Sequence, residues 1–243
     1  SSYEVTSLLK NPNKNSISDD DSLTGTFTLG SPNRTWNTPL QRDSGLVGYW
    51  KFDETSGTTA YDSSGFGNNG TLTNGPVQTT TSYGERVLQF DGTDDYVVTN
   101  AFSIPNQTGT LSISAWVNNA ILGQYQSILS DAHEGISEGY IWLYRSTNNN
   151  DFSLPYATGI SRLSAGLSSF FLNYDNQWVL STIVADYNNK NMKFYRNGIL
   201  VYTYTTANTM LFPDSLRTKF IGSYGAGGSE KYKGYLDDVR IYN

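Results

Sequence analysis

The sequence predicts an all-β protein built as a two-sheet antiparallel sandwich. From Gly45 onward, short runs rich in aromatic and β-branched residues follow one another, and Gly, Asn, Asp or Pro separates nearly all of them. In the run LSISAWV, Leu111, Ile113, Ala115 and Val117 occupy every second position, which places them on one face of a strand. No convincing amphipathic helix occurs after Gly45. Many short strands with turns between them favour a sandwich.

Residues 1–44 differ from the rest and predict an N-terminal extension or linker. YEVTSLLK (Tyr3–Lys10) predicts one or two helical turns, and TGTFTLG (Thr24–Gly30) predicts a short strand. The segments around that strand are rich in Asn, Ser, Asp and Pro, which is typical of turns. We therefore divide the chain into this extension, 1–44, and one β domain, 45–243.

The strands of the domain are expected at LVGYWKF, RVLQF, DYVVT, LSISAWV, YIWLYR, WVLSTIVADY, MKFYRNGILVYTY, KFIGSY and LDDVRIY. Asn197-Gly198 separates two of these runs and predicts a hairpin. The cluster DGTDD predicts a second hairpin turn with Asp91-Gly92 at its tip, and its three carboxylates are a weaker candidate for a metal site. ISRLSAGLSSFFL is a candidate helix, but Gly166 interrupts it and a loop is an equal interpretation.

Composition and charge disfavour several classes of function. The chain has 16 Lys and Arg against 22 Asp and Glu, so its net charge of −6 repels phosphate backbones and argues against nucleic acid. It has no cysteine, which excludes a disulfide framework, a thiol nucleophile and a thiolate metal site. Mean hydropathy is −0.45. No run approaches the roughly 18–20 apolar residues of a membrane span, so none is expected in this chain.

Six blocks occur along the chain in an order found in one family: GLVGYWKFDE, AYDSSGFGNNGTL, LQFDGTDDYV, LSISAWV, QWVLSTIVADYNNKNMKFYRNGILV, and FIGSY followed by YKGYLDDVRIYN. On these blocks Gly45–Asn243 resembles the bacterial laminin-G-like, concanavalin A-like lectin/glucanase sandwich domains. Trp178-Val179-Leu180 departs from the Trp-His-His run of that family, and the segment 120–177 matches poorly. The resemblance implies a jelly roll of one concave and one convex antiparallel sheet, with paired ends.

The resemblance also implies a function. Such domains are mostly non-catalytic binding or adhesion modules on secreted bacterial proteins, some bind glycans, and many hold a calcium ion at the sandwich edge. We therefore expect an extracellular or cell-surface, calcium-stabilised module that binds a carbohydrate or another surface ligand. The alternative is a structural or adhesive head of a pilin-like appendage, because Tyr3–Lys10 resembles the region just past the membrane helix of some pilin-like proteins. The chain would then belong to a larger surface protein or filament.

The loop DSSGFGNNGTL gathers oxygen-bearing side chains from Asp62 onward. Calcium takes six to eight hard oxygen ligands, which Asp62 and either Asn68 or Asn69 can supply in part. The resemblance adds Asp237, because related sandwich hydrolases place a calcium-binding Asp before a strand similar to VRIY, and Asp53 is a further candidate. The alternative is a turn-rich connection, with Asp237 capping a strand end.

The apparent catalytic motifs are not convincing, so we expect no enzyme. GISEG matches the nucleophile elbow, but no strand-to-helix pattern surrounds it and the sole histidine, His133, precedes it. Glu134 and Glu138 lie four apart in a glycine-containing loop, and the chain lacks the E-x-D-x-E strand of laminarinase-type enzymes. A glycoside hydrolase remains the weaker alternative. GSYGAGGSEKYKG precedes a strand rather than a helix, which predicts a mobile loop on the sandwich rim and not a phosphate cradle.

YIWLYR predicts a glycan platform, because sugar rings stack on exposed aromatic rings. Tyr140, Trp142 and Tyr144 share one face of this strand, and Ile141 and Leu143 share the other. If the aliphatic pair faces the core, the aromatic side chains face a ligand. Hydroxyl-bonding side chains follow at Arg145 and Asn148–Asn150, foremost Asn149, with Tyr125 or Tyr174 added from neighbouring loops. The alternative is that the aromatic face is the core face.

Overall fold

Strands alone make up the regular structure of the described part of the chain. The computed structural model describes residues 45–104, 109–119, 125–131, 141–145, 149–155, 162–167, 170–171, 173–210, 216–228 and 230–243, and for 141–145, 149–155 and 162–167 it describes the backbone only. The predicted extension, 1–44, lies outside these residues, together with its YEVTSLLK and TGTFTLG segments. Within the described ranges, no helix is long and apolar enough to cross a membrane.

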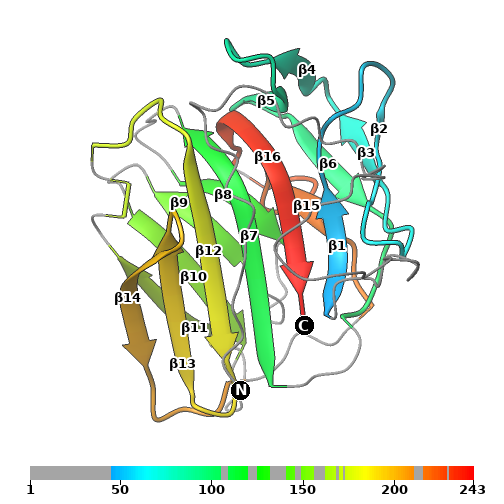
Figure 1. Cartoon of the computed structure of the whole chain (residues 1–243). Helices are drawn as coiled ribbons and strands as arrows, with labels where there is room; N and C mark the ends of the chain where they lie inside the picture. Colours follow the sequence, from blue (N-terminus) through cyan, green and yellow to red (C-terminus); the bar gives the residue numbers. More distant parts are fainter. Residues whose placement is uncertain are drawn as a thin grey trace, which may run out of the picture. The chain divides into compact units, whose positions relative to one another are not determined.

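The first sheet contains eight antiparallel strands. In spatial order these are β14 (Ile199–Thr205), β13 (Asn191–Arg196), β12 (Val179–Asp186), β7 (Thr110–Asn119), β16 (Lys233–Tyr242), β5 (Arg86–Asp91) and β4 (Val77–Thr80), and β1 (Leu46–Trp50) also pairs with β16. In Figure 1, β14, β13, β12, β7, β16 and β1 lie side by side in the nearer layer.

The second sheet also contains eight antiparallel strands. In spatial order these are β11 (Arg162–Leu167), β10 (Asn149–Pro155), β9 (Ile141–Arg145), β8 (Gln126–Ser130), β15 (Phe220–Ile221), β6 (Tyr96–Thr99), β3 (Gly70–Thr73) and β2 (Thr59–Ala60). The predicted two-sheet antiparallel sandwich is therefore confirmed.

Apolar residues from both sheets form one core. On β7, Leu111, Ile113, Ala115 and Val117 are each at most 1% exposed, as the alternation predicts. The second sheet contributes Val97, Ile128, Leu129 and Ile221. Burying one such large aliphatic side chain stabilises a fold by about 1.5–3 kcal/mol.

The structure confirms one predicted turn and corrects two other predictions. Asn197-Gly198 joins β13 to β14 with both residues at positive φ, 51° and 79°, as a tight hairpin turn requires. The turn at Asp91-Gly92 is not a hairpin, because β5 lies in the first sheet and the following β6 lies in the second. ISRLSAGLSSFFL is neither a helix nor a loop over its centre, because Arg162–Leu167 forms β11 against β10.

The two ends of the domain pair, as the resemblance implies. β1 runs antiparallel to the last strand, β16, and Asn243 donates a backbone hydrogen bond to the carbonyl of Gly45. One edge of β16 pairs first with β5, over Lys233–Leu236, and then with β1, over Val239–Tyr242. The pairing of β16 with β7 shifts register between Asp237 and Arg240, at the same point.

Candidate functional site

Asp62 closes the oxygen-rich loop onto the end of β1. Its Oδ1 accepts hydrogen bonds from the backbone N–H groups of Tyr49 and Ser64, each at 2.9 Å. Its Oδ2 accepts one from the Ser64 hydroxyl at 2.7 Å and one from the backbone N–H of Asn68 at 2.8 Å. The backbone of Asp62 also forms a bridge to Trp50, so this carboxylate fastens the loop to the first strand.

The two asparagines of the loop bond to the chain itself. Asn68 Nδ2 donates to the carbonyl of Val47 at 2.9 Å, and the Asn68 carbonyl accepts the Trp50 indole N–H at 3.0 Å. Asn69 Oδ1 accepts the backbone N–H of Asp62 at 2.9 Å. Calcium requires six to eight oxygens turned toward one point. Both carboxylate oxygens of Asp62 and the backbone carbonyl of Asn68 are instead already hydrogen-bonded within the protein.

The other two predicted metal ligands lie in the same region. Asp53 is half-buried just after β1, and Asp237 is 4% exposed on β16, whose Val239 is the register partner of Trp50. Among the described residues, the carboxylates of Asp53, Asp62 and Asp237 do not form a group within 4.8 Å of one another. Calcium binding by these four residues therefore stays a prediction from the sequence.

Asp238, a further carboxylate at this end of the sandwich, is paired with an arginine. Asp238 is 3% exposed, and its Oδ1 accepts the Tyr49 hydroxyl at 2.6 Å. Arg240 donates to the Tyr49 hydroxyl oxygen at 2.6 Å, lies 3.3 Å from Asp238 Oδ1 and stacks 4.2 Å from the Tyr49 ring centroid. Burial, followed by the charge of Asp238, raises the pKa of the Tyr49 phenol well above its usual range, so Tyr49 stays a donor.

The acidic turn Asp91–Asp95 brings Asp91, Asp94 and Asp95 within 4.8 Å of one another. Asp95 Oδ2 accepts the backbone N–H of Asp91 at 2.9 Å, and Asp91 Oδ1 accepts that of Thr93 at 2.7 Å. Lys231 is the cation coupled to the cluster. Burial lowers the pKa of Lys231, and the charges of Asp94 and Asp95 oppose that shift. Hydrogen bonds within the turn and this lysine account for the arrangement.

The predicted glycan platform falls on the part of the second sheet where only the backbone is described. Trp142 and Tyr144 lie on β9, opposite Phe152 and Asn150 of β10, and Arg145 lies opposite Asn149. Tyr140 lies outside the described residues, and for the other four residues the structure describes the backbone but not the side chains. The platform at these five residues stays a prediction. The two supporting tyrosines are associated with different sheets. Tyr125 directly precedes β8 of the second sheet, whereas the Tyr174 ring centroid lies 4.6 Å from Arg196 Cζ on β13 of the first sheet.

A hollow of about 510 Å³ lies beside β15, at the end of β8. Three segments far apart in the sequence line it: Ala101 after β6, Asp131 after β8, and the residues on either side of β15. Its apolar and aromatic lining is Leu216, Phe220 and Tyr224, its polar lining is Asp131, Arg217 and Thr218, and small residues complete it at Ala101, Gly225, Ala226, Gly227 and Gly228.

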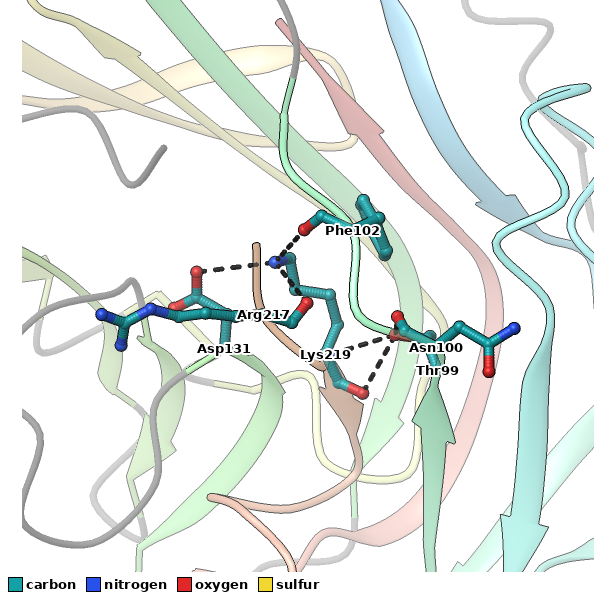
Figure 2. A network of polar contacts seen from close by, with 6 residues as sticks. All are labelled: Thr99, Asn100, Phe102, Asp131, Arg217 and Lys219. Atoms are coloured by element: carbon teal, nitrogen blue, oxygen red, sulfur yellow. Dashed lines mark hydrogen bonds and ion pairs between the residues drawn. The ribbon is translucent and has the colours of Figure 1, made fainter. Parts of the chain in front are cut away.

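Asp131, one of the lining residues, belongs to a buried ion pair (Figure 2). Lys219 Nζ lies 3.8 Å from Asp131 Oδ2, with both side chains 0% exposed, and donates to the carbonyls of Phe102 at 2.9 Å and Arg217 at 3.0 Å. The backbone N–H of Lys219 donates to Thr99 Oγ1 at 3.0 Å. Burial lowers the pKa of Lys219 to about 8, although the Asp131 charge opposes the shift. Buried charges persist where they are paired and hydrogen-bonded, as here.

The glycine-rich segment forms one wall of the hollow. Ser223 anchors the base of this wall: its hydroxyl donates to the Gly225 carbonyl at 2.6 Å and accepts from Lys231 Nζ at 2.9 Å, and its carbonyl accepts the Ser130 hydroxyl at 3.0 Å. A Cβ on Gly222 would lie 2.4 Å from the Phe90 ring, so only glycine fits there. These bonds fix the base of the segment, and the mobile loop on the sandwich rim stays a prediction.

The described lining of the hollow does not contain a pair of carboxylates. Among its described lining residues the carboxylate is Asp131 alone, whereas glycoside hydrolysis uses two carboxyl groups across one bond. The other motifs weighed for catalysis, GISEG with His133, Glu134 and Glu138, lie outside the described residues. Sequence reasoning missed Asp131, Arg217 and Tyr224. The glycine-rich segment was the available signal, but it predicts a loop and not which residues meet it.

Comparison with known proteins identifies the fold. A laminin G-type family model, described as the concanavalin A-like lectin/glucanases superfamily, matches residues 91–243. The solved structures that match include the binding domain of botulinum neurotoxin serotype D, with 16% identity and a TM-score of 0.58, covering 82% of this chain and 48% of that chain. Comparison with curated proteins yields no match.

Two further matching structures concern glycans. One is described by the statement "Cell entry of botulinum neurotoxin type C is dependent upon interaction with two ganglioside molecules", with 17% identity, a TM-score of 0.59, and coverage of 82% of this chain and 47% of that one. The other is a botulinum neurotoxin DC binding domain "in complex with SialylT", with 16% identity, a TM-score of 0.59, and coverage of 82% and 48%. This chain spans about half the length of these matched chains, and at such identities the likeness shows the fold.

Proposed function

Because the chain belongs to the concanavalin A-like lectin/glucanases superfamily, we propose that it is a non-catalytic binding module that takes a glycan into the hollow beside β15. The hollow carries this proposal. Its volume of about 510 Å³ lies within the roughly 300–1,000 Å³ typical of small-ligand sites, which combine apolar walls with a few placed polar groups.

The chemistry of the lining supports a sugar as the ligand. Tyr224 offers ring surface for the C–H face of a pyranose, and Thr218 and Arg217 can bond its hydroxyls. Phe220, which is only 9% exposed, adds apolar lining. Asp131 also borders the hollow, but its side chain is fully buried against Lys219, so the proposal assigns it no contact with the ligand. The ganglioside dependence of neurotoxin type C and the SialylT complex of the neurotoxin DC domain support the same class of ligand. An extracellular or cell-surface location goes with this proposal.

The alternative function, a head domain of a pilin-like appendage, rests on Tyr3–Lys10. That segment lies outside the described residues, so the alternative stays a prediction.

A glycan array followed by calorimetry on each hit tests the proposal. Tyr224→Ala and Arg217→Ala should each weaken binding about tenfold, which corresponds to about 1.4 kcal/mol. Tyr83→Ala is the matched control, because Tyr83 is an exposed tyrosine (67%) in the turn between β4 and β5, outside the hollow. Failure of the array to show binding, or equal losses in all three variants, would refute the assignment to the hollow.

A further inference from the structure

We propose that a cation-independent clamp, formed by Asp62, Asp238, Tyr49 and Arg240, holds the end of β1 and fills the role that the family resemblance assigns to calcium. The clamp joins three parts of the domain: the loop after β2, the first strand and the last strand. Positive charge and hydrogen-bond donors come from the protein itself, so no divalent cation is needed there.

The first half of the clamp is the carboxylate of Asp62. Both its oxygens accept two hydrogen bonds each, from Tyr49, Ser64 and Asn68, at 2.7–2.9 Å. A carboxylate offers about four lone-pair positions, so this set is filled. Since three of these donors are backbone N–H groups, a calcium ion in their place would leave those groups without an acceptor, at a cost comparable to a lost hydrogen bond each.

The second half is the carboxylate of Asp238, which has a fixed cation beside it. The Arg240 guanidinium lies 3.3 Å from Asp238 Oδ1 and is itself only 23% exposed. Burial alone would lower the pKa of Arg240, but the charge of Asp238 and the contact with Tyr49 raise it, so the guanidinium stays charged. A divalent cation at Asp238 would lie next to this charge and be repelled by it.

Tyr49 joins the two halves. Its backbone N–H donates to Asp62 at 2.9 Å and its hydroxyl donates to Asp238 at 2.6 Å. One residue of β1 therefore connects the loop on one side to β16 on the other, which is the bridging role of an ion shared by two carboxylates.

Thermal melting of metal-stripped protein, in EDTA and in 5 mM calcium, tests the clamp. The unmodified protein should melt within about 1 °C in the two buffers, because ligand binding to the folded state would raise its Tm. Asp62→Asn should lower the Tm by roughly 3–10 °C, equally in both buffers, since it weakens charge-assisted hydrogen bonds that no cation replaces. Tyr49→Phe should lower it equally in both as well.

Asp94→Asn is the matched control, because Asp94 is an exposed carboxylate of the acidic turn and takes no part in the clamp. A calcium response that Asp94→Asn removes would place the ion at that turn and leave the clamp standing. A calcium-dependent rise that Asp62→Asn or Tyr49→Phe abolishes would overturn the proposal and assign the loop to calcium. If Asp62→Asn fails to fold, Tyr49→Phe decides between these outcomes.

Discussion

Raising the pH from 7 to 10 should stabilise the folded protein through Lys219. Burial lowers the pKa of Lys219 to about 8 in the folded state, whereas an ordinary lysine has a pKa of about 10.4. Between these two values the unfolded chain binds the proton more strongly than the folded chain does. The free energy of unfolding therefore rises with pH in this window. The contribution is fully present above the unfolded pKa and is lost as the pH falls through 8.

The size of this effect follows from the two pKa values. A gap of about two units corresponds to about 3 kcal/mol, at roughly 1.4 kcal/mol per unit, and about 2–3 kcal/mol of it is gained by pH 10. Solvent screening does not reduce the figure, because the Lys219 side chain is 0% exposed. Burial raises the pKa of Tyr49 and of Tyr187. Stability should fall above pH 10, where the unfolded phenols lose their protons, and so peak near that pH.

Urea denaturation at pH 7, 8, 9 and 10 measures this dependence. Lys219→Met removes the titrating amine and should flatten the rise between pH 8 and 10, with each variant compared with itself at pH 7. Lys190→Met is the control, because Lys190 is a partly exposed lysine that donates to the Ala207 carbonyl, and the rise should survive in this variant. A full rise in Lys219→Met, or a flat profile in the unmodified protein, would refute the reasoning.

Two substitutions in the core should lower the midpoint of thermal unfolding. Gly222→Ala combines a left-handed backbone, φ 80°, with a Cβ placed 2.4 Å from the buried Phe90 ring, so it should lower the free energy of unfolding by about 2–4 kcal/mol. The control is Gly84→Ala, at φ 87° with open space around its Cβ, which should cost only about 1 kcal/mol. Equal losses of stability in the two variants would contradict the packing argument. Tyr232→Phe removes the hydroxyl that the fully buried Tyr232 donates to Asn119 Oδ1 and should cost about 1–3 kcal/mol; an unchanged midpoint would show that this bond contributes nothing.

Local patterns predicted the parts of the fold that local physics determines. The alternation in β7 and the Asn-Gly turn at Asn197 depend on neighbours within a few residues, and the structure confirms both. β8 escaped prediction because all five of its residues are buried, so its sequence QSILS lacks alternation. The Asp-Gly pair at Asp91 satisfies the same turn chemistry as a hairpin. Whether its two strands pair depends on which sheet receives the second strand, and the turn itself carries no information on that.

The candidate site depends on contacts that composition does not record. The oxygen-rich loop at Asp62 has the composition of a cation site, yet its carboxylate faces N–H groups that every backbone provides. The hollow is assembled from residues near 101, 131 and 216–228, which the pairing of β15 with β6 and β8 brings together. Asp131 could not be recognised as a lining residue from sequence, because Lys219, its partner, lies far along the chain.

Two strained backbone positions lie beside the clamp at the end of β1. Phe52 and Asp238, both buried, adopt positive φ values of 57° and 53°, a conformation that costs a non-glycine residue about 1–3 kcal/mol. Asp238 lies between the part of β16 that pairs with β5 and the part that pairs with β1, and Phe52 follows the end of β1. Tyr49 and Arg240 bond to Asp238 at this point. In the proposed clamp, these bonds offset the strain at the junction of the three strands.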